Sequence, residues 1–182
     1  MILWLQSGRG FTPLQAGLTL LWFSVGGILT APTAGTLALT RGRKVLVLGA
    51  LTMAAGTALL GVVVWNSGAS VSSWALGPGL LMAGAGLGWL IVPLVNVVLT
   101  AVPADGAGGA SGIFSTAQQF GGALGVALLG MVFFNHLASG GYDSAIRATL
   151  PWTVGAYLVC AALCLLLPRT AISEEEAANL LP

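Results

Sequence analysis

Two long stretches of this sequence carry no charged side chain, at residues 10–40 and 45–104. A helix of about 20 predominantly apolar residues is long enough to cross the hydrocarbon core of a bilayer. Only 6% of the residues are charged and 57% are hydrophobic, whereas a soluble domain has about 25% charged residues. The sequence therefore predicts an integral membrane protein.

The apolar runs favour helices over a barrel. Backbone groups inside lipid must be hydrogen-bonded within the protein, so spanning segments are helices or strands of a closed barrel. These runs lack the strict apolar–polar alternation of barrel strands. We therefore predict an all-α integral membrane fold. Five transmembrane helices are expected, at residues 13–39, 45–65, 74–98, 111–134 and 151–167, with loops between them.

The first predicted helix has a well-defined start. Thr12 can act as an N-cap, Pro13 occupies the favoured first helical position, and Gln15 lies three residues after the cap. This arrangement is a capping box with proline at N1. The domain organisation follows from the spans. We expect the end of a truncated preceding helix and an outer loop in residues 1–12, a five-helix bundle in 13–167 and a cytoplasmic tail in 168–182.

The cations predict an orientation. Half of the six fall in residues 41–44, between the first two predicted helices. Short cytoplasmic loops are enriched in Lys and Arg. If this loop is cytoplasmic, Arg169 lies on the same side, and only Arg9 and Arg147 lie outside. We therefore predict a multi-pass protein of the cell membrane with the amino-terminal stub outside and the carboxy terminus in the cytoplasm.

Several function classes are disfavoured. A net charge of +1 without a basic tract gives no indication of nucleic acid binding. Cys160 and Cys164 lie one helical turn apart in an apolar run, and two thiols alone rarely hold a metal. His136, the only histidine, and Asp143 are expected in a solvated loop. Without a cluster of histidine, carboxylate and serine near the predicted spans, we expect no metal, no cofactor and no enzymatic activity.

The segment GTLALTRGRK at residues 35–44 carries a specific pattern. It resembles the loop signature of the major facilitator superfamily, which joins paired helices and reads G-x-L-a-D-r-x-G-r-k. The matching residues are Gly35, Leu37, Ala38, Gly42, Arg43 and Lys44. Leu39 and Thr40 replace the family's acid and a frequent arginine. In the family that acid belongs to a charge network closing the cytoplasmic face, and the signature is commonly degenerate in its second copy.

Three further stretches, at residues 11–21, 76–94 and 108–130, resemble the fourteen-helix drug:proton antiporters of that superfamily. Their order and spacing are similar to helices ten to fourteen, so the resemblance covers nearly all of the chain. It implies five helices of the carboxy-terminal bundle and transport by alternating access, in which two bundles rock about a central site. The implied partners are the lipid bilayer, a small-molecule substrate, protons and the missing amino-terminal helices.

Two pairs of glycines have a spacing that suits close helix packing. Each pair is four residues apart, and small residues at this spacing let helix backbones approach closely. Packing without any further function explains each pair equally well. The pairs are Gly84 with Gly88 and Gly121 with Gly125.

Polar side chains inside a membrane are the usual indication of function. The resemblance implies that the helices at 74–98 and 111–134 border a central cavity. On them we expect a substrate pathway formed by Trp89, Asn96, Ser115, Gln118 and Gln119. Gln118 shares one face with Ser111, Ser115, Gly122 and Gly125 at helical spacing. Alternatively, these side chains bond to neighbouring helices, typically for under ~1 kcal/mol each.

The hypothesis that follows is part of a transporter that exports drugs or small organic molecules in exchange for protons. We expect the chain to be inactive alone, because none of its predicted spans holds a carboxylate. The alternative is a small membrane subunit or helix-packing module that does not itself transport. Multidrug efflux and antibiotic resistance are the processes that the resemblance implies.

Overall fold

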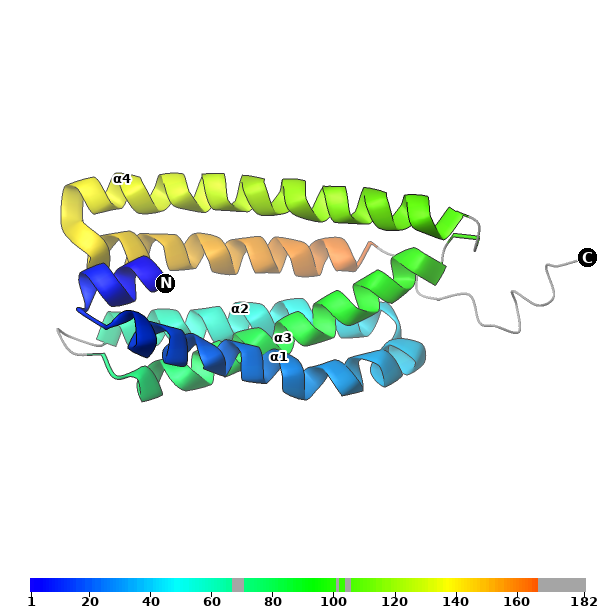
Figure 1. Ribbon diagram of the computed structural model, residues 1–182, viewed down its shortest axis with the longest axis horizontal. Coiled ribbons are helices and arrows are strands. Elements are labelled where there is room, and N and C mark those ends of the chain that lie inside the picture. The colour runs from blue at the N-terminus through cyan, green and yellow to red at the C-terminus, as the bar shows by residue number, and fades with distance from the viewer. Residues whose placement is uncertain (67–70, 101, 104–105, 167–182) are drawn as a thin grey trace, which may run out of the picture.

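The computed structural model describes residues 1–66, 71–100, 102–103 and 106–166, and most of these lie in helices (Figure 1). In chain order they are η1 (Trp4–Gly8), α1 (Pro13–Arg41), α2 (Arg43–Asn66), α3 (Ser73–Thr100) and α4 (Ala107–Cys164). Helices α1 to α4 are each long and apolar enough to cross a membrane. The prediction of an all-α membrane fold is confirmed.

Helix α4 folds back on itself at Gly141. The backbone angles there are φ 73° and ψ −174°, a conformation that is essentially restricted to glycine. Residues 107–140 form the first leg of α4 and residues 142–164 form the second leg, which runs back beside the first (Figure 1). The five predicted crossings therefore correspond to α1, α2, α3 and the two legs of α4.

The prediction of a long loop between the last two spans is wrong. Residues 135–150 are helical apart from the turn at Gly141. Their polar side chains bond to carbonyls of their own helix: the Ser139 hydroxyl donates to the Asn135 carbonyl oxygen at 3.4 Å, and the Thr149 hydroxyl donates to that of Ala145 at 2.8 Å. Such bonds satisfy the polar groups without breaking the helix. The polar composition of this segment is therefore compatible with a helix and is not evidence for a loop.

The capping box at the start of α1 is confirmed. The backbone N–H of Gln15 donates to the Thr12 hydroxyl oxygen at 3.2 Å. In return the backbone N–H of Thr12 donates to the Gln15 side-chain oxygen at 3.0 Å. Two N–H groups at the helix start are thereby satisfied.

Helix α3 is the centre of the packing, with α1 along one side and α2 along another. Glycines set the distance between α1 and α3. A Cβ on Gly26 would lie 2.8 Å from the Ala85 backbone nitrogen, and a Cβ on Gly84 would overlap the Phe23 carbonyl oxygen. The backbones of α1 and α3 are therefore in direct contact, as small residues in membrane helices allow.

The α2–α3 contact is built in the same way. A Cβ on Gly49 would lie 2.8 Å from the Gly86 carbonyl oxygen, and one on Gly56 would lie 2.5 Å from the Ala83 backbone nitrogen. The other faces of α2 pack against α4 or remain exposed. The exposed face is apolar, as expected for a surface in contact with lipid, and includes Leu48, Leu51, Val62 and Trp65.

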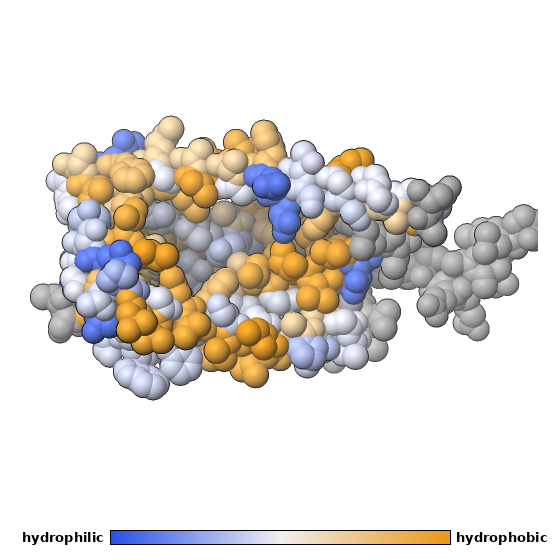
Figure 2. All heavy atoms as spheres, in the orientation of Figure 1, coloured by the Kyte–Doolittle hydropathy of each residue, from blue (hydrophilic) through white to orange (hydrophobic). Residues whose placement is uncertain are grey.

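Two turns define the two ends of the bundle. The Gly42 end holds the α1–α2 connection, and the Gly141 end holds the fold-back of α4 together with η1 (Figure 1). At the Gly141 end Trp4 and Leu5 of η1 are fully buried against side chains from α2, α3 and α4, including Val64, Leu76 and Ile146. Toward the viewer in Figure 2, the molecular surface is hollowed between two bands of side chains.

Candidate functional site

The first leg of α4 carries a polar face formed by Ser111, Ser115, Gln118, Gly122 and Gly125. This face lies on the side of the leg that the rest of the protein partly covers. Phe114, Gly125 and Leu129 are half-buried, although most of the leg is exposed. At about 100° per residue these three lie within about 40° of Gln118 around the helix axis. The apolar and highly exposed Ile113 and Phe120 lie about 140–160° away from Gln118. Gln118 therefore faces the same side as the residues that approach the bundle.

Three of the residues expected along the pathway have no partner in the described part of the chain. The side chains of Ser115, Gln118 and Gln119 are exposed, and none of them makes a hydrogen bond to another described residue. An unbonded amide facing hydrocarbon costs several kcal/mol. This face therefore needs water, a ligand or another helix beside it.

Trp89 and Asn96 on α3 are placed differently. The indole Nε1–H of Trp89 donates to the Thr33 hydroxyl oxygen of α1 at 3.0 Å, so Trp89 bonds to a neighbouring helix. Asn96 is exposed near the end of α3. Among described residues, no hydrogen bond joins Trp89 to Gln118 or Gln119. The structure thus places the five predicted pathway residues on two helices, with Trp89 and Asn96 on α3 and the other three on the first leg of α4.

The loop-signature residues lie at the Gly42 end, where α1 and α2 are joined by a single residue. Gly42 has φ 48°, a left-handed conformation that favours glycine. The Arg43 guanidinium donates from Nη1 to the Leu165 carbonyl oxygen at 2.8 Å, just beyond the end of α4. A cation at this position satisfies a terminal carbonyl and complements the negative end of the helix dipole. Lys44 is exposed, and a Cβ on Gly35 would meet open space.

The two predicted glycine pairs differ in their surroundings. On α3, a Cβ on Gly88 would lie 2.9 Å from the Gly27 carbonyl oxygen, one turn from the similar contact at Gly84. On the first leg of α4, a Cβ on Gly121 or Gly125 would find no described atom within 4 Å. A packing role for the second pair remains a prediction that requires a further helix beside α4.

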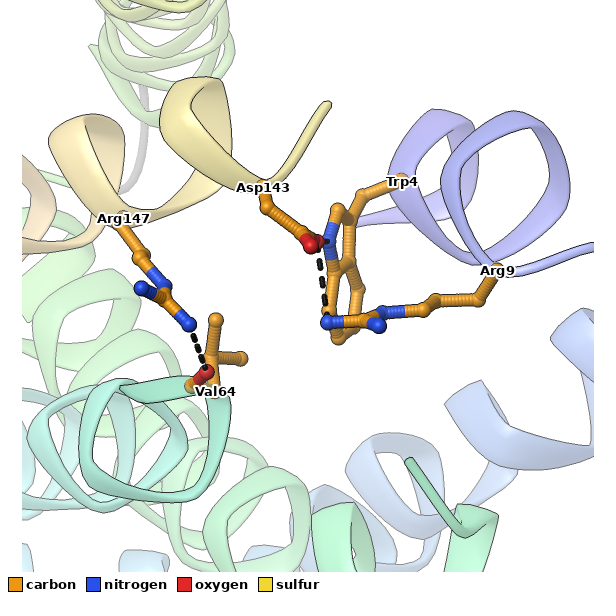
Figure 3. Close-up of polar contacts among 5 residues, drawn as sticks. All are labelled: Trp4, Arg9, Val64, Asp143 and Arg147. Carbon is orange, nitrogen blue, oxygen red and sulfur yellow. Dashed lines mark hydrogen bonds and ion pairs between the residues drawn. The ribbon is translucent and has the colours of Figure 1, made fainter. Parts of the chain in front are cut away.

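A charged cluster at the Gly141 end was not predicted (Figure 3). The Asp143 Oδ1 atom lies 3.0 Å from Arg9 Nη2 and accepts a hydrogen bond from the Trp4 indole Nε1–H at 2.8 Å. The Arg9 guanidinium carbon lies 5.0 Å from the centre of the Trp4 ring, within range of a cation–π interaction. Asp143 was expected in a solvated loop, and its side chain is 49% exposed, whereas the Arg9 side chain is only 5% exposed.

The cluster joins η1 to the second leg of α4. Gly8 reinforces this junction, since a Cβ there would lie 2.8 Å from the Tyr142 Cβ. Trp4 and Asp143 are 139 positions apart in the sequence. No pattern among neighbouring residues could therefore have identified their contact. The one feature of the sequence that drew attention to Arg9 and Asp143 was that charged residues are rare in this chain.

The described residues offer no metal site, because no three of their His, Cys, Asp and Glu side chains are grouped together. The thiols of Cys160 and Cys164 are free. What the geometry offers instead is a polar helix face beside a bundle packed through glycines, and a charged junction at one end.

Comparison with known proteins gives a consistent picture. Residues 1–180 match the family model described as Major Facilitator Superfamily. The chain is 38% identical over 143 residues to the "Probable actinorhodin transporter" of Streptomyces coelicolor, covering 76% of this chain and 24% of that protein. It is 36% identical over 135 residues to "Multidrug resistance protein Stp" of Mycobacterium tuberculosis, covering 74% of this chain and 24% of that protein.

A third relative matches almost the whole chain. The "Tetracenomycin C resistance and export protein" of Streptomyces glaucescens is 30% identical over 178 residues, covering 97% of this chain and 30% of that protein. The chain thus spans about a quarter to a third of the length of these curated relatives.

Proposed function

Because the chain belongs to the Major Facilitator Superfamily, we propose that it forms part of a membrane transporter that exports drugs or other small organic molecules. Membership of a transporter family and the membrane-spanning helices make it a multi-pass membrane protein and favour transport over catalysis. Relatives named for multidrug resistance and antibiotic export support the proposed class of substrate.

The polar face around Gln118 is the observation that carries this proposal. It lies on the partly covered side of the first leg of α4 and makes no hydrogen bond to described residues. Sites for small molecules are mostly apolar with a few placed polar groups. Ser115, Gln118 and Gln119 supply such groups beside glycines that leave room for a ligand, so this face lines the substrate pathway in our proposal. Trp89, the pathway candidate on α3, bonds to Thr33 of α1 and so holds these two helices together.

Proton exchange would depend on residues elsewhere in the complete transporter. Among the described residues Asp143 is the only acid, and it lies at the fold-back of α4, paired with Arg9. We therefore propose that residues 1–182 alone do not export. Cells expressing only this chain should show dye efflux at background level, and proton-dependent efflux above background would contradict the proposal.

The orientation is also a proposal. Arg43 and Lys44 at the Gly42 end indicate the cytoplasmic side, which puts the Gly141 end outside. Reporter fusions after Lys44 should then report the cytoplasm, and fusions within residues 66–73 should report the outside. The opposite pair of signals would overturn this topology.

The pathway role is tested by Gln118→Ala in the complete transporter, with Leu124→Ala as the matched control. Leu124 lies on the same leg, roughly 120° around the helix from Gln118. If Gln118 contacts substrates, its replacement should change which of several unrelated drugs the cells resist, while the amount of protein stays constant. A uniform loss of resistance in both variants that follows expression would refute the pathway role.

A further inference from the structure

A pocket of about 510 Å³ lies at the Gly141 end, apart from the proposed transport pathway. Three segments form it: the last turn of α2 with Trp65, the end of the first leg of α4 with His136, and the start of the second leg with Asp143, Ser144 and Arg147. The pocket therefore combines a guanidinium, an imidazole, a carboxylate, a hydroxyl and an indole ring in a chain that has few charges.

Arg147 is the central cation of this pocket. Its Nη2 donates to the Val64 carbonyl oxygen near the end of α2, with a long separation of 3.4 Å (Figure 3). Its Nε is buried and has no hydrogen-bond partner among the described residues. No carboxylate in the described part of the chain pairs with Arg147, and a guanidinium has five N–H donors. Capping α2 thus accounts for only one of its donors.

The acid in the pocket is already paired. Asp143 Oδ1 bonds to both Arg9 and Trp4, so the Arg9 cation compensates its charge. Arg9, Asp143 and Arg147 together carry a net charge of +1, and the uncompensated cation is Arg147. This charge balance favours an anion over a cation as the ligand.

One further donor, the Ser144 hydroxyl, is available beside Arg147, and the His136 ring lines the same pocket. The Nδ1 atom of His136 contacts the Val132 carbonyl oxygen at 2.9 Å. Because a carbonyl can only accept, this nitrogen carries the proton, so Nε2 is an acceptor in the neutral ring and donates to an anion only in the imidazolium form. The hydroxyl of Ser144 makes no hydrogen bond to a described residue. Gly140 allows Ser144 to approach the first leg, since a Cβ there would lie 2.7 Å from the Ser144 Cβ.

The position of the pocket suggests where the anion comes from. Trp65 borders it and is 60% exposed, and Trp74 and Trp152 are exposed as well. Trp side chains are enriched at the level of the lipid headgroups. Planar guanidinium groups bind phosphate through paired N–H donors. We propose that this pocket binds a phosphate group, either that of an anionic phospholipid headgroup or free phosphate.

The test uses the full 182-residue chain in detergent, with native mass spectrometry to count bound phosphatidylglycerol and phosphatidylcholine. The wild-type chain should retain phosphatidylglycerol preferentially. Arg147→Gln should weaken this binding by at least about tenfold, as expected when a charge-assisted hydrogen bond is lost. Lys44→Gln, which removes a cation at the Gly42 end, is the matched control and should retain the lipid.

Titration of lipid-free chain with inorganic phosphate distinguishes the two sources. Saturable phosphate binding that Arg147→Gln removes, without a preference for phosphatidylglycerol, would assign the site to free phosphate. Arg147→Lys keeps the charge and should retain part of the binding, and circular dichroism of each variant checks that the helices persist. Equal binding of both probes by wild type and a folded Arg147→Gln variant would overturn the proposal. None of these readouts depends on export.

Discussion

The contact between α1 and α3 gives a sharp test of how this bundle is held together. In Gly84→Ala the added Cβ would overlap the Phe23 carbonyl oxygen and lie 2.7 Å from the carbonyl carbon. Both of these atoms belong to the backbone, so no side-chain rotation can make room. The helices must separate, and overpacking of this kind costs about 1–3 kcal/mol.

A graded series strengthens this prediction. In Gly88→Ala the new Cβ would meet the Thr30 hydroxyl, which can rotate away and lose its 3.0 Å hydrogen bond to the Ala85 carbonyl oxygen. That loss is worth about 0.5–1.5 kcal/mol. The new Cβ would also lie 2.9 Å from the Gly27 carbonyl oxygen, which requires a smaller backbone shift than the overlap at Gly84. Gly61→Ala on α2 meets no described atom within 4 Å and serves as the control. The expected order of destabilisation is Gly84→Ala, then Gly88→Ala, then Gly61→Ala.

The measurement is the free energy of unfolding of each variant in detergent micelles, obtained by titration with sodium dodecyl sulfate and followed by circular dichroism. A difference of about 1.4 kcal/mol changes the folded-to-unfolded ratio tenfold, which such a titration resolves. If Gly84→Ala proved as stable as Gly61→Ala, the close contact between the α1 and α3 backbones would be refuted.

Two further predictions concern the Gly141 end. Gly141→Ala should destabilise the protein by about 1–3 kcal/mol, because the backbone angles at this position strongly disfavour any residue other than glycine. The same titration measures this loss. A loss no larger than that of Gly130→Ala would contradict the prediction. Asp143→Asn should cost roughly 1–2 kcal/mol, because it leaves the buried Arg9 without its anion while Asp143 itself is half solvated. A double-mutant cycle with Arg9→Gln should show coupling, and additive losses would exclude a direct interaction.

The helices were predictable because their signals are local. Long uncharged runs, the Thr12–Gln15 capping box and Gly42 in the loop signature are all read from neighbouring residues. The same local reasoning failed at residues 135–150, where polar side chains resembled a loop. There the hydroxyls of Ser139 and Thr149 bond to carbonyls one turn back, so the helix continues.

The site was less predictable than the fold. Helical spacing placed Gln118 and Ser115 on one face, but spacing alone does not indicate which side of a helix is covered. The junction of Trp4, Arg9 and Asp143 depends on two segments that are far apart in the sequence, since Trp4 and Asp143 are 139 positions apart. Only the three-dimensional arrangement of η1 beside the fold-back of α4 reveals it.

The single-residue link at Gly42 has a mechanical consequence. One residue is too short to let α1 and α2 move independently, and both helices are fitted to α3 by direct backbone contacts at glycines. We therefore expect these three helices to move together. Helix α4 is attached to them mainly along α2 and through the junction with η1. Among the described helices we therefore expect a relative movement to be a rotation of the α4 hairpin about its contact with α2, opposed by the Arg9–Asp143 ion pair.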